Sequence, residues 1–225
     1  MHLSVVMPVY NEIKTIEEII RKVLNVEIPL ELIIVDDCST DGTRQYLQQF
    51  SNERTRVYFH ERNRGKGAAI HTAIQHIRGD ITIIQDADLE YDPADYPNLT
   101  DLIVKNKADV VYGSRFLFRT RIFHFHHLLG NKIVNLCANI LYNSTFTDLE
   151  TCYKAFRSDI LKNMRLRSRS FGFEAEVTAK VIKQRLRVYE VPISYYGRTY
   201  EEGKKITWKD GIIALYWLLR CRFGA

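Results

Sequence analysis

The sequence predicts an α/β fold with a mostly parallel, doubly wound sheet flanked by helices. Apolar, β-branched runs typical of buried parallel strands alternate with segments of helical period over roughly the first 115 residues. The 225 residues hold no internal repeat, low-complexity tract or Pro/Gly-rich linker. Such alternation favours parallel strands joined by right-handed helical crossovers, and one domain is the simplest account.

The first half contains five expected strands and four expected helices. The strands are expected at residues 3–9, 30–37, 55–61, 80–86 and 109–115. The helices are expected at residues 11–25, 41–50, 65–77 and 93–106. In the first of these helices, apolar residues from Ile13 to Leu24 recur at the i, i+3, i+4 spacing of a helix that buries one face. Ser39, Thr40 and Asp41 can each cap the second helix.

The second half is less regular. Helices are expected at residues 130–143, 171–184 and 207–222, and strands near 147–157, after a loop, and at 186–195. The last helix is rich in aromatic residues and ends in Arg220 and Arg222, a composition suited to a membrane interface as well as to a core. Its longest apolar run, residues 212–219, is too short to cross a bilayer.

Composition indicates a globular protein, whereas the mildly basic net charge decides little about its partners. Hydrophobic residues make up 46% and charged residues 26% of the chain, and the net charge is +5. A mildly basic balance suits a phosphorylated ligand, an anionic membrane face or nucleic acid, so it does not choose between them. The four cysteines form no CxxC pair and have no histidine at zinc-ligand spacing, which favours reduced thiols in the cytoplasm. The start of the sequence lacks the features of a signal peptide.

A cluster of four carboxylates follows the fourth expected strand, in DADLEYDP at residues 86–93. Ligands of an open parallel sheet bind beyond the carboxyl ends of its strands. The segments MPVYNE, VDDCSTDG and GSRF are expected at the same edge of the sheet as this cluster. Close carboxylates repel one another unless a cation lies between them. Mg²⁺ and Mn²⁺ prefer such oxygen ligands together with substrate phosphates, and alternate residues of an extended loop can face one side. Capping of the next helix, or exposure to solvent, is the simpler alternative.

Two common phosphate-binding motifs are absent. No GxGxxG follows the first expected strand, which argues against a dinucleotide-binding domain. GKG at residues 65–67 lacks the GxxxxGK(S/T) spacing of a P-loop, although Lys66 stands at the start of a helix, a good position for an anion. A nucleotide would therefore be bound by another arrangement.

Eight segments in a fixed order carry a resemblance to a known family. They are VVMPVYNE (5–12), IIVDDCSTDGT (33–43), NRGKGAA (63–69), QDADLEYDP (85–93), GSRF (113–116), TDLETCYKAF (147–156), FGFEAE (171–176) and VYEVPISYYGRTYEEGKK (188–205). With them, the chain resembles the family 2 glycosyltransferases of the GT-A fold, and more narrowly the dolichyl/polyprenyl-phosphate sugar synthases. The resemblance implies the GT-A (nucleotide-diphospho-sugar transferase) fold for a single domain of residues 1–225. This domain would comprise a nucleotide-sugar-binding half (1–116), an acceptor-binding half (117–206) and a terminal amphipathic helix (207–225).

The resemblance also implies roles for individual residues. Those expected to bind the nucleotide-sugar are Pro8, Tyr10, Glu12, Asp37, Ser39 and Asp86. Asp88 and Glu90 are expected to bind Mg²⁺ or Mn²⁺. Those expected to hold the acceptor phosphate are Arg115, Arg121, Arg198, Lys204 and Lys205. Asp88, Arg115 and Arg198 are expected to be catalytic.

The implied reaction is inverting transfer of a hexose, mannose or glucose, from GDP- or UDP-sugar to polyprenyl or dolichyl phosphate. A phosphate acceptor is ionised near neutral pH and needs no strong general base, but it needs guanidinium or ammonium groups for positioning. The expected setting is the cytoplasm, with peripheral contact at the cytoplasmic membrane face through residues 207–225 and no nucleic acid partner.

Other interpretations are open from sequence alone. The first alternative is a family 2 glycosyltransferase that acts on a saccharide or other hydroxyl acceptor in cell-envelope or exopolysaccharide synthesis. A nucleotidyltransferase is less favoured because MPVYNE is not a glycine-rich loop, and a non-enzymatic sugar-nucleotide-binding module would need a silent metal site. Asp148 and Glu150 could anchor a loop or touch ligand. Glu174 and Glu176, on an expected helix, could face solvent, with a site role as the alternative for Glu176. HFHH (124–127) is expected in a surface or interfacial loop.

Overall fold

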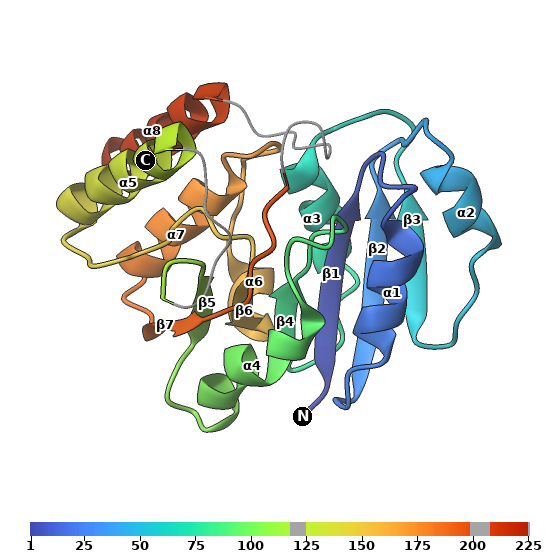
Figure 1. Ribbon diagram of the computed structural model, residues 1–225. Coiled ribbons are helices and arrows are strands. Elements are labelled where there is room, and N and C mark those ends of the chain that lie inside the picture. The colour runs from blue at the N-terminus through green and yellow to red at the C-terminus, as the bar shows by residue number, and fades with distance from the viewer. Residues whose placement is uncertain (118–124, 199–207, 225) are drawn as a thin grey trace.

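The structure is a computed structural model, and it describes residues 1–117, 125–198 and 208–224. Four residues singled out in the sequence therefore lie outside the described residues: Arg121, His124, Lys204 and Lys205. The described segments form one central sheet with three layers of helices around it. Figure 1 colours the chain from blue at the N-terminus to red at the C-terminus.

The central sheet has seven strands in the order β3-β2-β1-β4-β6-β5-β7 (Figure 1). The strands are β1 (Leu3–Val9), β2 (Leu30–Asp36), β3 (Thr55–Phe59), β4 (Ile81–Ile84), β5 (Val110–Ser114), β6 (Lys154–Arg157) and β7 (Val188–Pro192). Neighbouring strands pair in parallel except at β6, which lies antiparallel between β4 and β5. The mostly parallel α/β sheet predicted from the sequence is confirmed.

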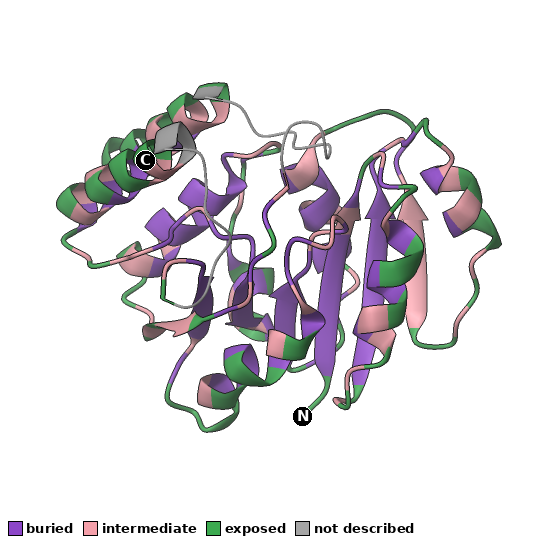
Figure 2. Ribbon diagram, viewed as in Figure 1, coloured by how far each residue is buried: buried purple, intermediate pink, exposed green. Residues whose placement is uncertain are grey.

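Helices cover both faces of the sheet, which explains why its central strands are apolar on both sides. One face carries α1 (Ile16–Leu24), α2 (Thr43–Gln49) and α4 (Tyr96–Val104), the last preceded by the short 3₁₀ turn η1 (Pro93–Asp95). The other face carries α3 (Lys66–Ile74), α6 (Ser158–Asn163) and α7 (Phe173–Lys183). In Figure 2 the central strands are buried along nearly their whole length, whereas the covering helices show exposed outer sides.

A third layer forms where α5 (Phe125–Tyr142) and α8 (Trp208–Phe223) pack against α7 (Figure 1). Small side chains allow the close approach, because Ala175 and Ala179 of α7 share one buried cluster with Ala138 of α5 and Ala214 of α8. The Tyr142 hydroxyl links the two outer helices by donating to a carbonyl of α8, at 2.7 Å. Among the described residues, no helix is long and apolar enough to span a bilayer.

The second half differs from expectation in three ways. Helix α5 begins by residue 125 rather than 130, and the strand expected near 147–157 forms only over β6. The six-residue helix α6 follows β6 directly and was not predicted, because so short a segment carries no clear period. Strand β5 pairs with β6 and β7, so one sheet contains strands from both halves of the expected single domain.

Candidate functional site

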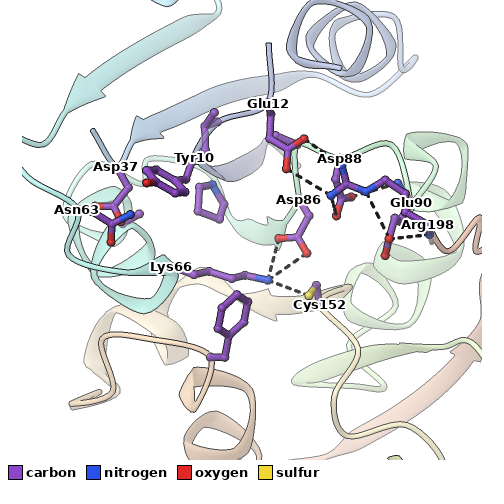
Figure 3. A pocket seen from close by; sticks show the side chains of 15 residues that line it. Tyr10, Glu12, Asp37, Asn63, Lys66, Asp86, Asp88, Glu90, Cys152 and Arg198 are labelled. Carbon is purple, nitrogen blue, oxygen red and sulfur yellow. Dashed lines mark hydrogen bonds and ion pairs between the residues drawn. The ribbon is translucent and has the colours of Figure 1, made fainter. Parts of the chain in front are cut away.

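A cavity of about 370 Å³ lies at the carboxyl ends of β1, β2 and β4 (Figure 3). Its volume falls within the range of small-molecule sites in proteins. Eight residues predicted for the site line it: Pro8, Tyr10, Glu12, Asp37, Asp86, Asp88, Glu90 and Arg198. The other lining residues are Val9, Asn63, Lys66, Ala69, Ala87, Cys152 and Phe171. The edge expected to bind ligand thus carries a formed cavity.

Three residues in the loops at this edge adopt left-handed backbone torsions, namely Asn11 (φ 52°), Cys38 (φ 66°) and Leu89 (φ 64°). Such torsions cost free energy and persist where neighbouring contacts hold them. The Asn11 N–H donates to Ser39 Oγ at 2.9 Å, and its Oδ1 accepts from the Thr40 N–H at 2.8 Å. Ser39, predicted to bind nucleotide, therefore joins two loops and does not itself line the cavity.

The carboxylate of Asp37 organises the start of α3. It accepts the backbone N–H of Arg64 at 2.9 Å and that of Gly65 at 2.7 Å, and His60 Nδ1 lies 2.6 Å from the same carboxylate. Gly65 has φ 91°, and a Cβ there would meet the Arg169 carbonyl oxygen at 2.4 Å, so only glycine fits. Asp37 lines the cavity near Tyr10 and Asn63, but its oxygens already serve this turn (Figure 3).

A buried group of charged side chains, here called the lysine cluster, comprises Lys66, Asp86, Cys152, Lys154 and Glu174. The Lys66 ammonium lies 2.8 Å and 3.0 Å from the two Asp86 oxygens and 2.8 Å from Cys152 Sγ (Figure 3). Lys154 is fully buried and bonds to Glu174 and to the Leu149 carbonyl. Burial works to raise the pKa of Asp86, but the positive charge of Lys66 and the hydrogen bonds with Cys152 and Lys66 together outweigh it and lower that pKa. Asp86 is therefore an ionised partner of Lys66.

The FGFEAE segment supports this cluster from α7. Glu174 contacts Lys154 and lies 3.7 Å from Lys66, while Glu176 accepts the N–H groups of Arg167 and Ser168. In the loop they hold, the Arg169 carbonyl accepts the Ala68 N–H of α3, at 3.1 Å. Glu174 and Glu176 thus act as structural supports rather than solvent-facing residues, an alternative that the sequence left open.

A second group, here called the arginine cluster, comprises Glu12, Asp88, Glu90 and Arg198. The Arg198 guanidinium lies 3.1 Å from Glu12, 3.1 Å from Asp88 and 3.5 Å from Glu90 (Figure 3). Glu90 also accepts the Tyr195 hydroxyl at 2.5 Å and the Arg198 N–H at 2.8 Å. Burial, followed by the negative charges of Asp86 and Glu90, raises the pKa of Asp88 to about 7. Leu89 makes this segment a turn rather than the expected extended loop, yet both flanking carboxylates line the cavity.

The donor set of the arginine cluster fits a divalent cation. Five carboxylates and two cationic side chains line the cavity, so negative charge is in excess there. Within residues 1–117, 125–198 and 208–224, no three side chains form a ready metal cage. Mg²⁺ and Mn²⁺ are commonly bound by one or two carboxylates with substrate phosphates completing the shell, and Asp88 and Glu90 suit that arrangement.

Arg115, predicted to hold the acceptor phosphate, is paired with a buried carboxylate. Its guanidinium forms a two-point ion pair with Asp148, at 2.7 Å for each contact, and it does not line the cavity. The same guanidinium stacks 5.1 Å from the ring centroid of Tyr195, whose hydroxyl donates to Glu90. Arg115 and Asp148 therefore help to position a carboxylate of the site, and the phosphate contact of Arg115 stays a prediction.

Four polar or aromatic lining residues were absent from the predicted site, although each falls in a segment that carried the family resemblance. Asn63 and Lys66 belong to NRGKGAA, Cys152 to TDLETCYKAF, and Phe171 to FGFEAE. The one available signal was the position of Lys66 at a helix start, which suggested an anion-binding position. In the structure the Lys66 ammonium contacts the Asp86 carboxylate.

Comparison of the sequence with known proteins gives one family and several relatives. The family model described as Glycosyl transferase family 2 matches residues 4–165. Glycosyltransferase AglJ of Haloferax volcanii is 29% identical over 198 residues, which are 87% of this chain and 63% of that protein. A dolichol-phosphate mannosyltransferase of Pyrococcus furiosus is 26% identical over 211 residues, 91% of this chain and 59% of that protein. The chain spans roughly three fifths of the length of these relatives.

Comparison of the structure identifies the fold. Glucosyl-3-phosphoglycerate synthase from Mycobacterium tuberculosis, solved with Mn²⁺, UDP and phosphoglyceric acid, superposes with a TM-score of 0.76 at 19% identity, covering 99% of this chain and 78% of that one. A mannosyltransferase from Pyrobaculum calidifontis, solved with GDP-Man and Mn²⁺, gives 0.61 at 22% identity, covering 84% of this chain and 54% of that one. The predicted GT-A fold is confirmed.

Proposed function

The chain belongs to glycosyltransferase family 2, and from this membership we propose that it transfers a hexose from a GDP- or UDP-sugar to polyprenyl or dolichyl phosphate, with inversion. The observation that carries the proposal is the cavity itself, in which Asp86, Asp88 and Glu90 face Lys66 and Arg198 at the ends of the parallel strands. A dolichol-phosphate mannosyltransferase among the relatives supports the lipid acceptor.

The two ends of the cavity suit the two ends of a nucleotide-sugar. Tyr10, Asp37 and Asn63 lie together at one end, where a ring and hydrogen-bonding groups can receive a base and ribose (Figure 3). The arginine cluster and Asp86 lie at the other end, where the diphosphate and hexose would be held. A Mg²⁺ or Mn²⁺ ion bound by Asp88 and Glu90 would neutralise charge on the leaving diphosphate.

The acceptor side depends on cationic side chains. A lipid phosphate is already ionised near neutral pH, so its oxygen can attack the anomeric carbon without a strong general base. Arg198 opens into the cavity and is our candidate for the first contact with that phosphate, with Arg121, Lys204 and Lys205 as further candidates outside the described residues. A guanidinium binds phosphate through two parallel hydrogen bonds, which suits the positioning role.

Peripheral membrane contact forms part of the proposal, and the outer helices support it. Each bears large exposed apolar residues at spacings of four, three and four. They are Leu129, Ile133, Leu136 and Ile140 on α5 and Ile212, Tyr216, Leu219 and Phe223 on α8. Lys132, Lys209, Arg220 and Arg222 on the same helices add positive charge. Apolar residues flanked by cations suit the headgroup region of an anionic leaflet.

A direct assay tests the reaction. The protein is incubated with polyprenyl phosphate, Mn²⁺ or Mg²⁺, and a panel of GDP-mannose, UDP-glucose and related donors, and lipid-linked hexose is scored. We expect transfer from one donor, and its loss when the cation is chelated. A parallel arm offers saccharide acceptors, and product formed only in that arm would replace the lipid-phosphate acceptor with a hydroxyl acceptor.

Liposome flotation tests the membrane contact separately. We expect the protein to float with vesicles containing anionic lipid and to float less with purely zwitterionic vesicles. Replacing Ile212 and Phe223 with serine should weaken flotation, whereas replacing the exposed Val104 of α4 with serine should not. Equal flotation of both variants would contradict the role of α8.

A further inference from the structure

Arg198 occupies the position in which a divalent cation would be useful. Its guanidinium is shared by three carboxylates from two loops, with contacts of 3.1 Å to Glu12, 3.1 Å to Asp88 and 3.5 Å to Glu90 (Figure 3). These side chains are largely buried, with exposed fractions of 10–17%. In this state, the guanidinium is the positive charge that keeps the carboxylates together.

A metal ion and this guanidinium compete for the same oxygens. An Mg²⁺ ion binds carboxylate oxygens at about 2.1 Å and demands a nearly octahedral shell, which leaves little room for a guanidinium on the same atoms. Two positive charges in contact repel each other near a protein surface, and the repulsion doubles when one of them is divalent. The guanidinium would therefore leave Asp88 and Glu90 when the metal binds.

The backbone allows this exchange without moving the segment that carries Arg198. Tyr195 forms an isolated antiparallel bridge with Tyr91, and the Tyr196 N–H donates to the Glu90 carbonyl at 2.9 Å. The start of the Arg198 segment is thus tied to the loop that carries Glu90, and the flexible arginine side chain alone can swing from carboxylate to ligand.

We propose that Arg198 and the divalent cation are alternative partners of Asp88 and Glu90, so that metal loading frees the guanidinium for the acceptor phosphate. The acceptor half of this statement rests on the proposed function, whereas the exchange itself does not. The exchange makes binding ordered: the metal and its nucleotide-sugar enter first, and the phosphate site is complete only afterwards. In the absence of donor and metal, the carboxylates also neutralise the Arg198 guanidinium that would hold the acceptor phosphate.

The first experiment measures metal binding without any donor or acceptor. Mn²⁺ affinity is determined by calorimetry for wild type, Arg198→Gln and the matched control Arg64→Gln, which removes an exposed positive charge from the loop beside the cavity. We expect Arg198→Gln to bind Mn²⁺ about tenfold more tightly, a typical coupling between two exclusive ligands, and the control to change by less than about twofold. Unchanged or weaker binding by Arg198→Gln overturns the proposal.

The second experiment separates exchange from simple loss of charge. Arginine side-chain NMR follows the guanidinium of Arg198, assigned by its absence in Arg198→Gln, during titration with diamagnetic Mg²⁺. We expect hindered rotation about the Cζ–Nη bonds in the metal-free protein, and release of that restraint at saturating Mg²⁺. A guanidinium that stays restrained overturns the exchange even if hexose transfer occurs, and an observed exchange without transfer overturns only the proposed function.

Discussion

Two aspartates of one loop, Asp86 in the lysine cluster and Asp88 in the arginine cluster, have the same exposed side-chain fraction of 17% but opposite pKa shifts. The pKa of Asp86 is lowered, whereas that of Asp88 is raised to about 7. Burial acts to raise both, so the neighbouring charges make the difference. Lys66 bonds both Asp86 oxygens, whereas Asp88 meets the like charges of Asp86 and Glu90 and one contact from a shared Arg198.

The comparison separates a fixed ion pair from an exchangeable one. Lys66 begins α3, which packs on the sheet, and Asp86 follows strand β4 of the same sheet, so both partners are anchored at the core. Arg198 lies after β7 and reaches its carboxylates by its side chain alone. The lysine cluster thus holds the local structure of the cavity, whereas the arginine cluster is suited to exchange of ligands.

The largest effect should come from removing the charge of Asp88. We expect Asp88→Asn to lower kcat/KM for hexose transfer by about a thousandfold, because a metal ion on the leaving group supplies several kcal/mol of transition-state stabilisation. Asp92→Asn is the control, since Asp92 caps η1 through the Ala94 N–H and does not line the cavity. Near wild-type transfer by Asp88→Asn would remove Asp88 from the metal site.

The second effect is on folding and belongs to the lysine cluster. Asp86→Asn leaves the Lys66 ammonium without its charged partner, and breaking such a buried pair should cost about 3 kcal/mol in the free energy of unfolding. Asp88→Asn removes repulsion from the arginine cluster and should change that free energy by less than about 1 kcal/mol. Urea unfolding at pH 7 measures both, and equal losses would show that the two clusters do not differ.

The third effect concerns Glu150, whose pKa is raised to about 7 by burial and then by the charge of Glu174 in the lysine cluster. Between pH 4.5 and 7 the folded protein retains a proton that the unfolded chain has lost, so stability falls as pH rises through this window. We expect Glu150→Gln to be about 2 kcal/mol more stable than wild type at pH 8 and similar to it at pH 4. A difference that does not depend on pH would rule out this ionisation.

The smallest effect should follow loss of the Tyr195 hydroxyl, which donates to Glu90 at 2.5 Å. A hydrogen bond to a charged group contributes about 1.5 kcal/mol, so Tyr195→Phe should raise the Mn²⁺ concentration for half-maximal transfer by about tenfold or less. Maximal transfer at saturating Mn²⁺ should change little. An unaltered Mn²⁺ requirement would indicate that Glu90 needs no help from Tyr195.

The parts of the fold that the sequence predicted are those encoded locally. Continuous apolar runs indicated the strands, helical periods indicated α1 and α7, and the strand ends placed Asp37, Asp86 and Asp88 at one edge. The antiparallel direction of β6 could not be predicted this way, because a four-residue strand has no orientation of its own.

The partners of the charged residues were also beyond local reasoning. Arg198 meets Glu12 across 186 positions of the sequence, and Arg115 is paired with Asp148 instead of facing the cavity. Residue type alone marks an arginine as suited to phosphate, but it does not say whether a carboxylate elsewhere in the fold already neutralises it. Ser39 illustrates the same limit, because its hydroxyl serves a neighbouring loop.

Strand β6 sets the order in which the molecule can be completed during synthesis. In the described sheet, β5 joins the first four strands only through β6, although the ribosome makes β5 earlier. A nascent chain that stops before residue 157 would therefore leave β4 with an open edge and β5 without its bridge. Cys152 directly precedes this strand, so its part of the cavity wall and the bridge between β4 and β5 form together, before Phe171 and Arg198 complete the lining.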